Sequence, residues 1–131
     1  ESDFIIFSTD EIEAATQFSP TVLFVGNYYT EAEYGNLLNS ITSGGAIIYS
    51  EQNDNISASL KQSDNFFRKI SYPSPKFRIQ PTYTLLESDF GNISIQINDE
   101  AALRDLLGAQ QFCQQFGIME DEFYESLVSF Q

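Results

Sequence analysis

The sequence contains no histidine and a single cysteine, and these two shortages exclude several classes of chemistry. Without imidazole there is no Ser-His or Cys-His dyad and no histidine-ligated metal, and one thiolate cannot assemble a structural zinc site. Cys113 has no partner for a disulfide within the chain, which is typical of a reducing compartment. We therefore predict an intracellular protein that is not an enzyme and has no catalytic residues, metal ligands or cofactor.

Long apolar runs are also missing. No stretch approaches the roughly 18 uncharged residues of a membrane span, and the start at Glu1, Ser2 and Asp3 lacks the basic region of a signal peptide. We expect a soluble chain that does not cross a membrane. The 42% hydrophobic content, with 12 Phe and 7 Tyr, supplies ample apolar area for a core. A length of 131 residues predicts one domain over residues 1–131.

Basic residues are scarce and unevenly placed. There are 19 acidic and 6 basic residues, and the net charge is −13. Residues 1–60 contribute −9 without a single base, residues 61–80 contribute +4, and residues 81–131 contribute −8. A basic island therefore stands between two acidic segments; it consists of Lys61, Arg68, Lys69, Lys76 and Arg78.

This charge pattern restricts the partner. An acidic domain repels the phosphate backbone, so we expect no direct binding of nucleic acid. The acidic surfaces either bind a protein with a basic surface or only keep the domain soluble. The basic island either binds an acidic or phosphorylated segment or pairs with the domain's own carboxylates. The acidic residues at the start of the last predicted helix either bind the partner or complement the helix dipole; they are Glu120, Asp121, Glu122 and Glu125.

The first half of the chain predicts a strand–helix–strand unit. An apolar strand at 21–25 is followed by a helix at 31–42, whose start carries the capping-box pair Thr30 and Glu33. Gly44 ends this helix in the left-handed conformation, and a second buried strand at 46–49 should run parallel to the first. An extra strand at 3–7, and a short helix capped by Ser8, precede the unit.

The second half is less regular in its pattern. We predict a polar loop with about one helical turn at 51–66, a strand at 66–72, and a proline-broken segment as far as Pro81. A short helix at 82–88 and a strand at 93–97 follow. Asn98 is the expected N-cap of a longer helix, and the last helix begins near Glu120. Together these elements predict an α/β fold of three layers around a small, mainly parallel sheet.

The unit from Thr21 to Tyr49, with Gly44-Gly45 between its helix and its second strand, resembles the opening of a BRCT domain. The stretch 79–86, which contains Pro81-Thr82-Tyr83, is similar to the second helix of that fold in telomeric repressor-activator proteins of the yeast type. The resemblance covers about residues 20–108 as a core. It leaves the N-terminal strand–helix and a C-terminal helical extension at 109–131 outside.

This resemblance implies a non-catalytic protein–protein interaction module in a nuclear, chromatin- or telomere-associated protein. Phosphopeptide-binding members have Ser or Thr before the glycine that ends the first strand, whereas here Val25 precedes Gly26, and Lys76 is a displaced candidate for their lysine. We therefore expect no intact phosphate pocket. The alternative is a stand-alone acidic inhibitor, immunity-like or DNA-mimic protein that blocks a basic partner, in which case a cytoplasmic location is equally suitable.

Overall fold

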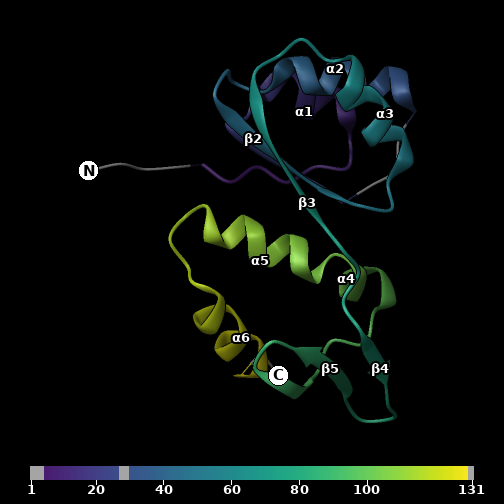
Figure 1. Ribbon diagram of the computed structural model, residues 1–131, viewed down its shortest axis with the longest axis vertical. Coiled ribbons are helices and arrows are strands. Elements are labelled where there is room, and N and C mark those ends of the chain that lie inside the picture. Colours follow the sequence, from purple (N-terminus) through teal and green to yellow (C-terminus); the bar gives the residue numbers. More distant parts are fainter. Residues whose placement is uncertain (1–4, 27–29, 130–131) are drawn as a thin grey trace.

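The computed structural model describes residues 5–26 and 30–129 (Figure 1). Helices and strands alternate in the first half, and strands precede helices in the second. In chain order the elements are α1 (Ile12–Phe18), β1 (Val22–Val25), α2 (Glu31–Ser40), β2 (Gly45–Ser50), α3 (Asp54–Gln62), β3 (Phe67–Tyr72), β4 (Phe77–Ile79), β5 (Thr84–Ser88), β6 (Gly91–Ile95), α4 (Glu100–Arg104), α5 (Leu106–Gln114) and α6 (Glu120–Ser129).

The first sheet consists of three parallel strands in the order β1-β2-β3. Val22 of β1 is opposite Ala46 of β2, and Gly45 is opposite Phe67 of β3. The central strand β2 is apolar and buried along its first four residues, as expected for a parallel strand covered on both faces. The predicted parallel pairing of the strands at 21–25 and 46–49 is therefore confirmed.

Helices cover both faces of this parallel sheet. α2 and α3 lie on one face and enclose a core that includes Tyr34, Leu38 and Ile56, all fully buried (Figure 1). α5 lies against the other face and contacts all three strands. The ring of Phe24 packs there at 6.0 Å from that of Phe112. The parallel sheet thus forms the middle layer of three.

Of the local signals around α2, the one at its start behaves as predicted. The Thr30 side chain accepts a hydrogen bond from the Glu33 N–H at 3.3 Å, and the Glu33 carboxylate accepts one from the Thr30 N–H at 3.0 Å. This reciprocal capping box fixes the start of α2. Gly44 has φ of 85°, so its predicted left-handed conformation is confirmed. The predicted helix end is wrong, because α2 ends at Ser40 with an extended C-cap at Ile41, and Gly44 belongs to the turn before β2.

A second, antiparallel sheet follows in the order β4-β5-β6, with α6 packed beside it. Its core contains the fully buried Leu86, Ile95 and Leu103 together with Tyr124. The predicted helix at 82–88 is wrong, because Thr84–Ser88 is the central strand of this sheet. β5 pairs with a neighbour on each side, Phe77 opposite Leu86 and Thr84 opposite Ile95, and these long-range pairings determine its conformation. The fold is therefore α/β with one small parallel and one small antiparallel sheet.

The polar segment after β2 forms a full helix, α3, where we expected a loop with one turn. Asn53 caps it by accepting from the Ile56 N–H at 3.2 Å, and its amide donates to the Tyr34 hydroxyl at 2.8 Å. Ile56 and Leu60, one turn apart, bury against the core below. Two apolar side chains and a buried cap were sufficient to form this helix.

Four further predictions about elements and their caps are also wrong. The described part of the N-terminal strand, residues 5–7, is not a strand, and Ser8 does not cap α1, whose N-cap is Glu11. Later in the chain Asp99 rather than Asn98 provides the cap, accepting from the Ala101 N–H at 3.2 Å. The long helix expected there is divided at Asp105 into α4 and α5.

In the part of the chain that the structure describes, no helix has the length and apolar character needed to cross a membrane.

Candidate functional site

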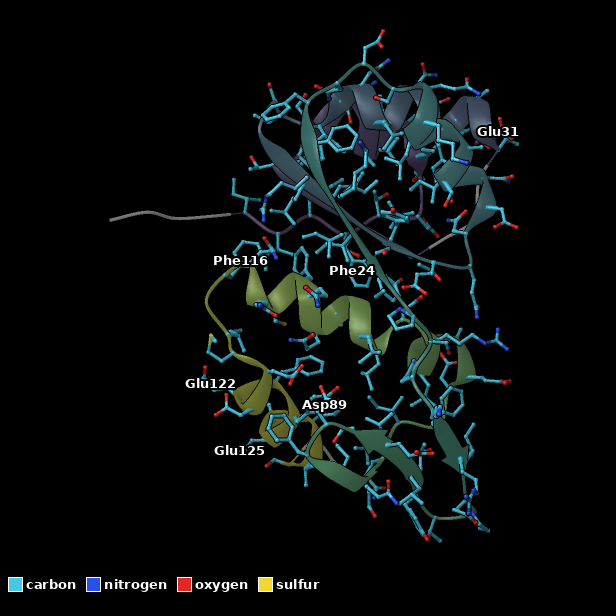
Figure 2. All side chains as sticks on the ribbon, in the orientation of Figure 1. Phe24, Glu31, Asp89, Phe116, Glu122 and Glu125 are labelled. Carbon is cyan, nitrogen blue, oxygen red and sulfur yellow. The ribbon has the colours of Figure 1, made fainter. Side chains whose placement is uncertain are left out.

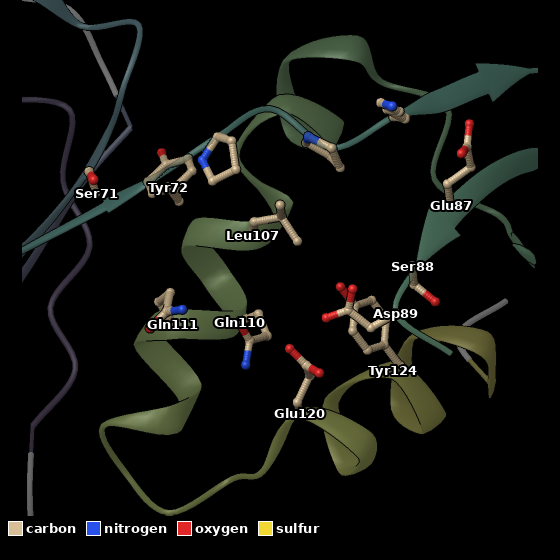
Figure 3. Close-up of a pocket in the computed structure, with 13 residues that line it drawn as sticks. Ser71, Tyr72, Glu87, Ser88, Asp89, Leu107, Gln110, Gln111, Glu120 and Tyr124 are labelled. Carbon is tan, nitrogen blue, oxygen red and sulfur yellow. The ribbon is translucent and has the colours of Figure 1, made fainter. Parts of the chain in front are cut away.

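A cleft of about 360 Å³ lies between the two sheets. The end of β3 and the following prolines form one side, α5 lies behind it, and the β5–β6 turn meets the start of α6 (Figure 3). We call it the acidic cleft. It is lined by Ser71, Tyr72, Pro73, Pro75, Lys76, Glu87, Ser88, Asp89, Leu107, Gln110, Gln111, Glu120 and Tyr124.

Charge of one sign dominates this lining. Glu87 and Asp89 come from β5 and the turn after it, and Glu120 comes from the first turn of α6. Figure 3 shows the Asp89 and Glu120 side chains near the Tyr124 ring, with Glu87 at the far end of the cleft. Among the described lining residues Lys76 is the one cation. Segments that are distant in sequence thus bring three carboxylates to one concave surface.

The electrostatics of Tyr124 reflect this arrangement. Burial raises the pKa of the Tyr124 hydroxyl, and the negative charges of Glu120 and then Asp89 raise it further. A neighbouring carboxylate has this effect because it opposes the formation of a second negative charge. The cleft therefore favours positive groups over negative ones.

A neutral polar residue lies at the back of the cleft. Gln110 of α5 is only 4% exposed, and its amide donates to Gln114 at 3.1 Å. Such a buried amide offers hydrogen bonds to a ligand without adding charge. The combination suits a cation that also makes neutral hydrogen bonds.

A second hollow of about 400 Å³ adjoins the first on the antiparallel sheet. Lys76, Arg78 and Glu87 line it together with Phe77 and Leu85. Lys76 and Glu87 border both hollows, so the positive charge of the basic island reaches the acidic cleft only at its rim.

The structure divides the basic island among separate elements. Lys61 is in the last turn of α3, Arg68 and Lys69 are on β3, and only Lys76 and Arg78 share a hollow. The Arg68 guanidinium donates to Gln115 at 2.9 Å. Among the described residues the one salt bridge joins Arg104 to Glu100, so no cation of the island pairs with a described carboxylate.

The acidic group on α6 is divided as well. Glu120 is half-buried in the acidic cleft, whereas Asp121, Glu122 and Glu125 are exposed. Figure 2 shows Glu122 and Glu125 on the outer side of α6. Glu122 accepts a hydrogen bond from the Met119 N–H at 3.0 Å, which stabilises the helix start. Sequence reasoning found Glu120 and Lys76 but missed Glu87 and Asp89, although the sequence Ser88-Asp89-Phe90-Gly91 has the composition of a turn.

A buried polar pair lies at the carboxyl end of the parallel sheet. The Tyr72 hydroxyl donates to the Asp105 carboxylate at 2.9 Å. Burial raises the pKa of Asp105, while the Tyr72 hydrogen bond and the Arg104 charge act against that rise.

Within residues 5–26 and 30–129 no group of three His, Cys, Asp or Glu side chains is placed to hold a metal ion.

No family model matches this sequence. No curated protein matches it either. Solved structures do resemble the fold. A UDP-N-acetylmuramoylalanyl-D-glutamyl-2,6-diaminopimelate–D-alanyl-D-alanyl ligase from Acinetobacter baumannii matches with a TM-score of 0.68 at 14% identity, over 93% of this chain and 32% of that one.

Two further structures agree. A crystal structure of MurF from Acinetobacter baumannii gives a TM-score of 0.68 at 14% identity, over 94% of this chain and 32% of that one. The UDP-N-acetylmuramate:L-alanyl-gamma-D-glutamyl-meso-diaminopimelate ligase from Neisseria meningitides gives 0.68 at 9% identity, over 89% and 42%. The chain is thus similar in fold to part of a Mur ligase, and it spans 31–42% of the length of these ligases.

The BRCT resemblance is therefore wrong. The similar folds are those of Mur ligases, and the stretch 79–86, taken as the second BRCT helix, instead contributes strands β4 and β5 of the antiparallel sheet. A Gly-Gly helix end before an apolar strand is too common in α/β proteins to identify a family. The nuclear, chromatin and telomere assignments depended on that resemblance and are withdrawn with it.

Proposed function

We propose that this chain is a non-catalytic binding domain whose acidic cleft receives a cationic group from a basic protein partner. The observation that carries the proposal is that Asp89 and Glu120, from two distant segments, lie close to Tyr124 in one cleft of about 360 Å³, whose lining also includes Glu87 (Figure 3). A lysine or arginine side chain entering the cleft gains attraction from Asp89 and Glu120, and the buried Gln110 in the same lining offers neutral hydrogen bonds.

The charge of the whole chain supports the same partner class. A net charge of −13 raises the local concentration of cations near the surface and accelerates encounter with a basic protein. It opposes the approach of nucleic acid, because phosphate binding depends on clustered Lys and Arg, and the basic island is divided among α3, β3, β4 and the loop before β4. We retain an intracellular location as part of this proposal, since the one cysteine forms no pair within the chain.

The test uses two isosteric triple variants of equal charge. The cleft variant carries Glu87→Gln, Asp89→Asn and Glu120→Gln. The matched control carries Asp121→Asn, Glu122→Gln and Glu125→Gln, which lie outside the cleft. Binding of a fluorescent oligolysine peptide is followed by anisotropy over a range of salt concentrations. The cleft variant should bind about tenfold more weakly, and the control should lose far less, because only the former removes charges that line the cleft.

Two outcomes contradict the proposal. Equal losses in both variants mean that general charge, and not the cleft, attracts the peptide. Binding that does not weaken with salt is inconsistent with an electrostatic contact, since screening shortens to about 8 Å at 0.15 M.

A second candidate is favoured by the comparisons. The likeness to Mur ligases over 89–94% of this chain suggests a segment that contributes to ligation in a longer protein. UDP-N-acetylmuramate, which the Neisseria enzyme is named for, is the appropriate probe. Calorimetric titration of this chain with UDP-N-acetylmuramate supports the ligase candidate if it saturates. The first proposal would be wrong if UDP-N-acetylmuramate bound saturably in the acidic cleft and an added oligolysine peptide competed with it for that cleft.

A further inference from the structure

The strand β1 forms one edge of the parallel sheet, and it lacks the usual protection of an edge. It pairs only with β2 among the described residues. Its sequence, Val-Leu-Phe-Val, contains no charge and no proline. The opposite edge, β3, carries Arg68 and Lys69, the kind of charged side chains that prevent unwanted pairing.

Hydrogen-bond geometry identifies the groups that β1 leaves open. The Ala46 N–H donates to the Thr21 carbonyl at 2.8 Å, which fixes the phase of the β1–β2 ladder. Because alternate residues turn their backbone groups to opposite sides, Leu23 bonds toward β2 while Val22 and Phe24 turn their N–H and C=O groups outward. No residue that the structure describes bonds these outward groups.

The two faces of β1, in contrast, are already covered. Leu23 packs on the core beneath α2 and α3. The Phe24 ring packs on the other face at 5.9 Å from the Tyr72 ring and 6.0 Å from the Phe112 ring. An added strand would therefore extend the parallel sheet at its β1 edge, beside a strand whose two faces are already packed.

The composition of β1 and the charge of the N-terminal half indicate what kind of strand fits. β1 itself is apolar. Residues 1–60 contain nine acidic residues and no base. A suitable strand has an apolar centre and basic flanks. A second copy of this chain lacks such flanks and carries the same charge of −13.

We propose that the free edge of β1 binds an apolar β-strand with basic flanks from a partner protein, which would extend the parallel sheet by main-chain hydrogen bonds to Val22 and Phe24. This mode of recognition gives affinity through the backbone and selectivity through the flanking charges. It uses a surface separate from the acidic cleft, so either proposal can fail without the other.

The probe is a short capped peptide with two lysines at each end of the sequence Thr-Val-Ile-Val-Thr. Amide hydrogen exchange is measured by NMR on the whole chain, with and without the peptide. In the free protein the Val22 and Phe24 amides should exchange quickly and those of Leu23 and Val25 slowly. The peptide should slow the two fast amides by about tenfold or more and leave α6 unchanged.

Two controls make the result specific. Val22→Pro removes an outward N–H without removing a bond to β2, and it should abolish the protection at Phe24. If that variant does not fold, a peptide with alternate N-methylated amides replaces it and should fail to protect the wild-type chain. Replacing the peptide's lysines by glutamates should weaken binding by about tenfold.

Several outcomes overturn the proposal. They are slow exchange at Val22 and Phe24 in the free protein, protection at another surface only, equal binding of the N-methylated peptide, and equal binding of the glutamate peptide. Self-association of the free chain through β1 in sedimentation experiments, with the same amides protected, also overturns it and identifies a second copy as the occupant.

Discussion

The Tyr72 hydroxyl and the Asp105 carboxylate are joined by a hydrogen bond of 2.9 Å that links the end of β3 to the junction of α4 and α5. Gly108 packs on the same tyrosine ring, and a Cβ at Gly108 would lie 2.5 Å from Tyr72 Cε2 and 2.7 Å from Phe24 Cε1. The approach of α5 to the parallel sheet therefore depends on the absence of a side chain at one position and a hydrogen bond at another.

Gly108→Ala should lower the free energy of unfolding by about 1–3 kcal/mol, because the added methyl overpacks the contact between α5 and the sheet. Gly35→Ala is the matched control, since Gly35 is also inside a helix but a Cβ there would meet nothing within 4 Å. That variant should gain about 0.5–1 kcal/mol from helix propensity. Urea denaturation measures both; a stabilising Gly108→Ala would contradict the close packing.

Asp105→Asn should raise the melting temperature at pH 7, because it removes a carboxylate whose pKa is raised by burial while keeping an oxygen acceptor for Tyr72. Because the pKa of Asp105 is raised in the folded state, folding favours the protonated carboxyl group. This contribution to the free energy of unfolding is fully present below the unfolded pKa of about 3.9 and is lost as pH rises through the pKa of the folded state. The advantage of Asp105→Asn should therefore disappear near pH 3.

Melting curves at both pH values check this expectation, with the exposed loop substitution Asp64→Asn as the control. A gain at pH 7 that persists unchanged at pH 3 would mean that the carboxylate charge is not the cause.

Gly44→Val should cost about 1–2 kcal/mol or more, since a β-branched residue poorly tolerates the φ of 85° found there. Space is not the reason, because nothing lies within 4 Å of a Cβ at Gly44. Gly44→Asn should cost clearly less, since asparagine adopts the left-handed region more readily. Chemical denaturation of the two variants measures the difference, and equal losses would show that backbone conformation is not decisive.

Local signals made part of this fold predictable from sequence. Thr30 and Glu33 cap α2 through contacts within one turn, and Gly44 ends the connection to β2 through its own backbone freedom. The helix predicted at 82–88 failed because Thr84–Ser88 pairs with strands on both sides, and no local pattern contains that information. The acidic cleft is harder still, since Asp89 and Glu120 line one cleft only after α6 has packed beside the antiparallel sheet.

The position of α5 between two cores has a consequence for how the molecule unfolds. Its Leu106 belongs to the core of the antiparallel sheet, while its Phe112 packs on Phe24 of the parallel sheet. One short helix thus contributes side chains to two hydrophobic cores. If α5 leaves either sheet, apolar side chains of both cores become exposed to solvent. Heating should therefore melt both sheets in one cooperative transition, and the acidic cleft between them vanishes at the same temperature as either core.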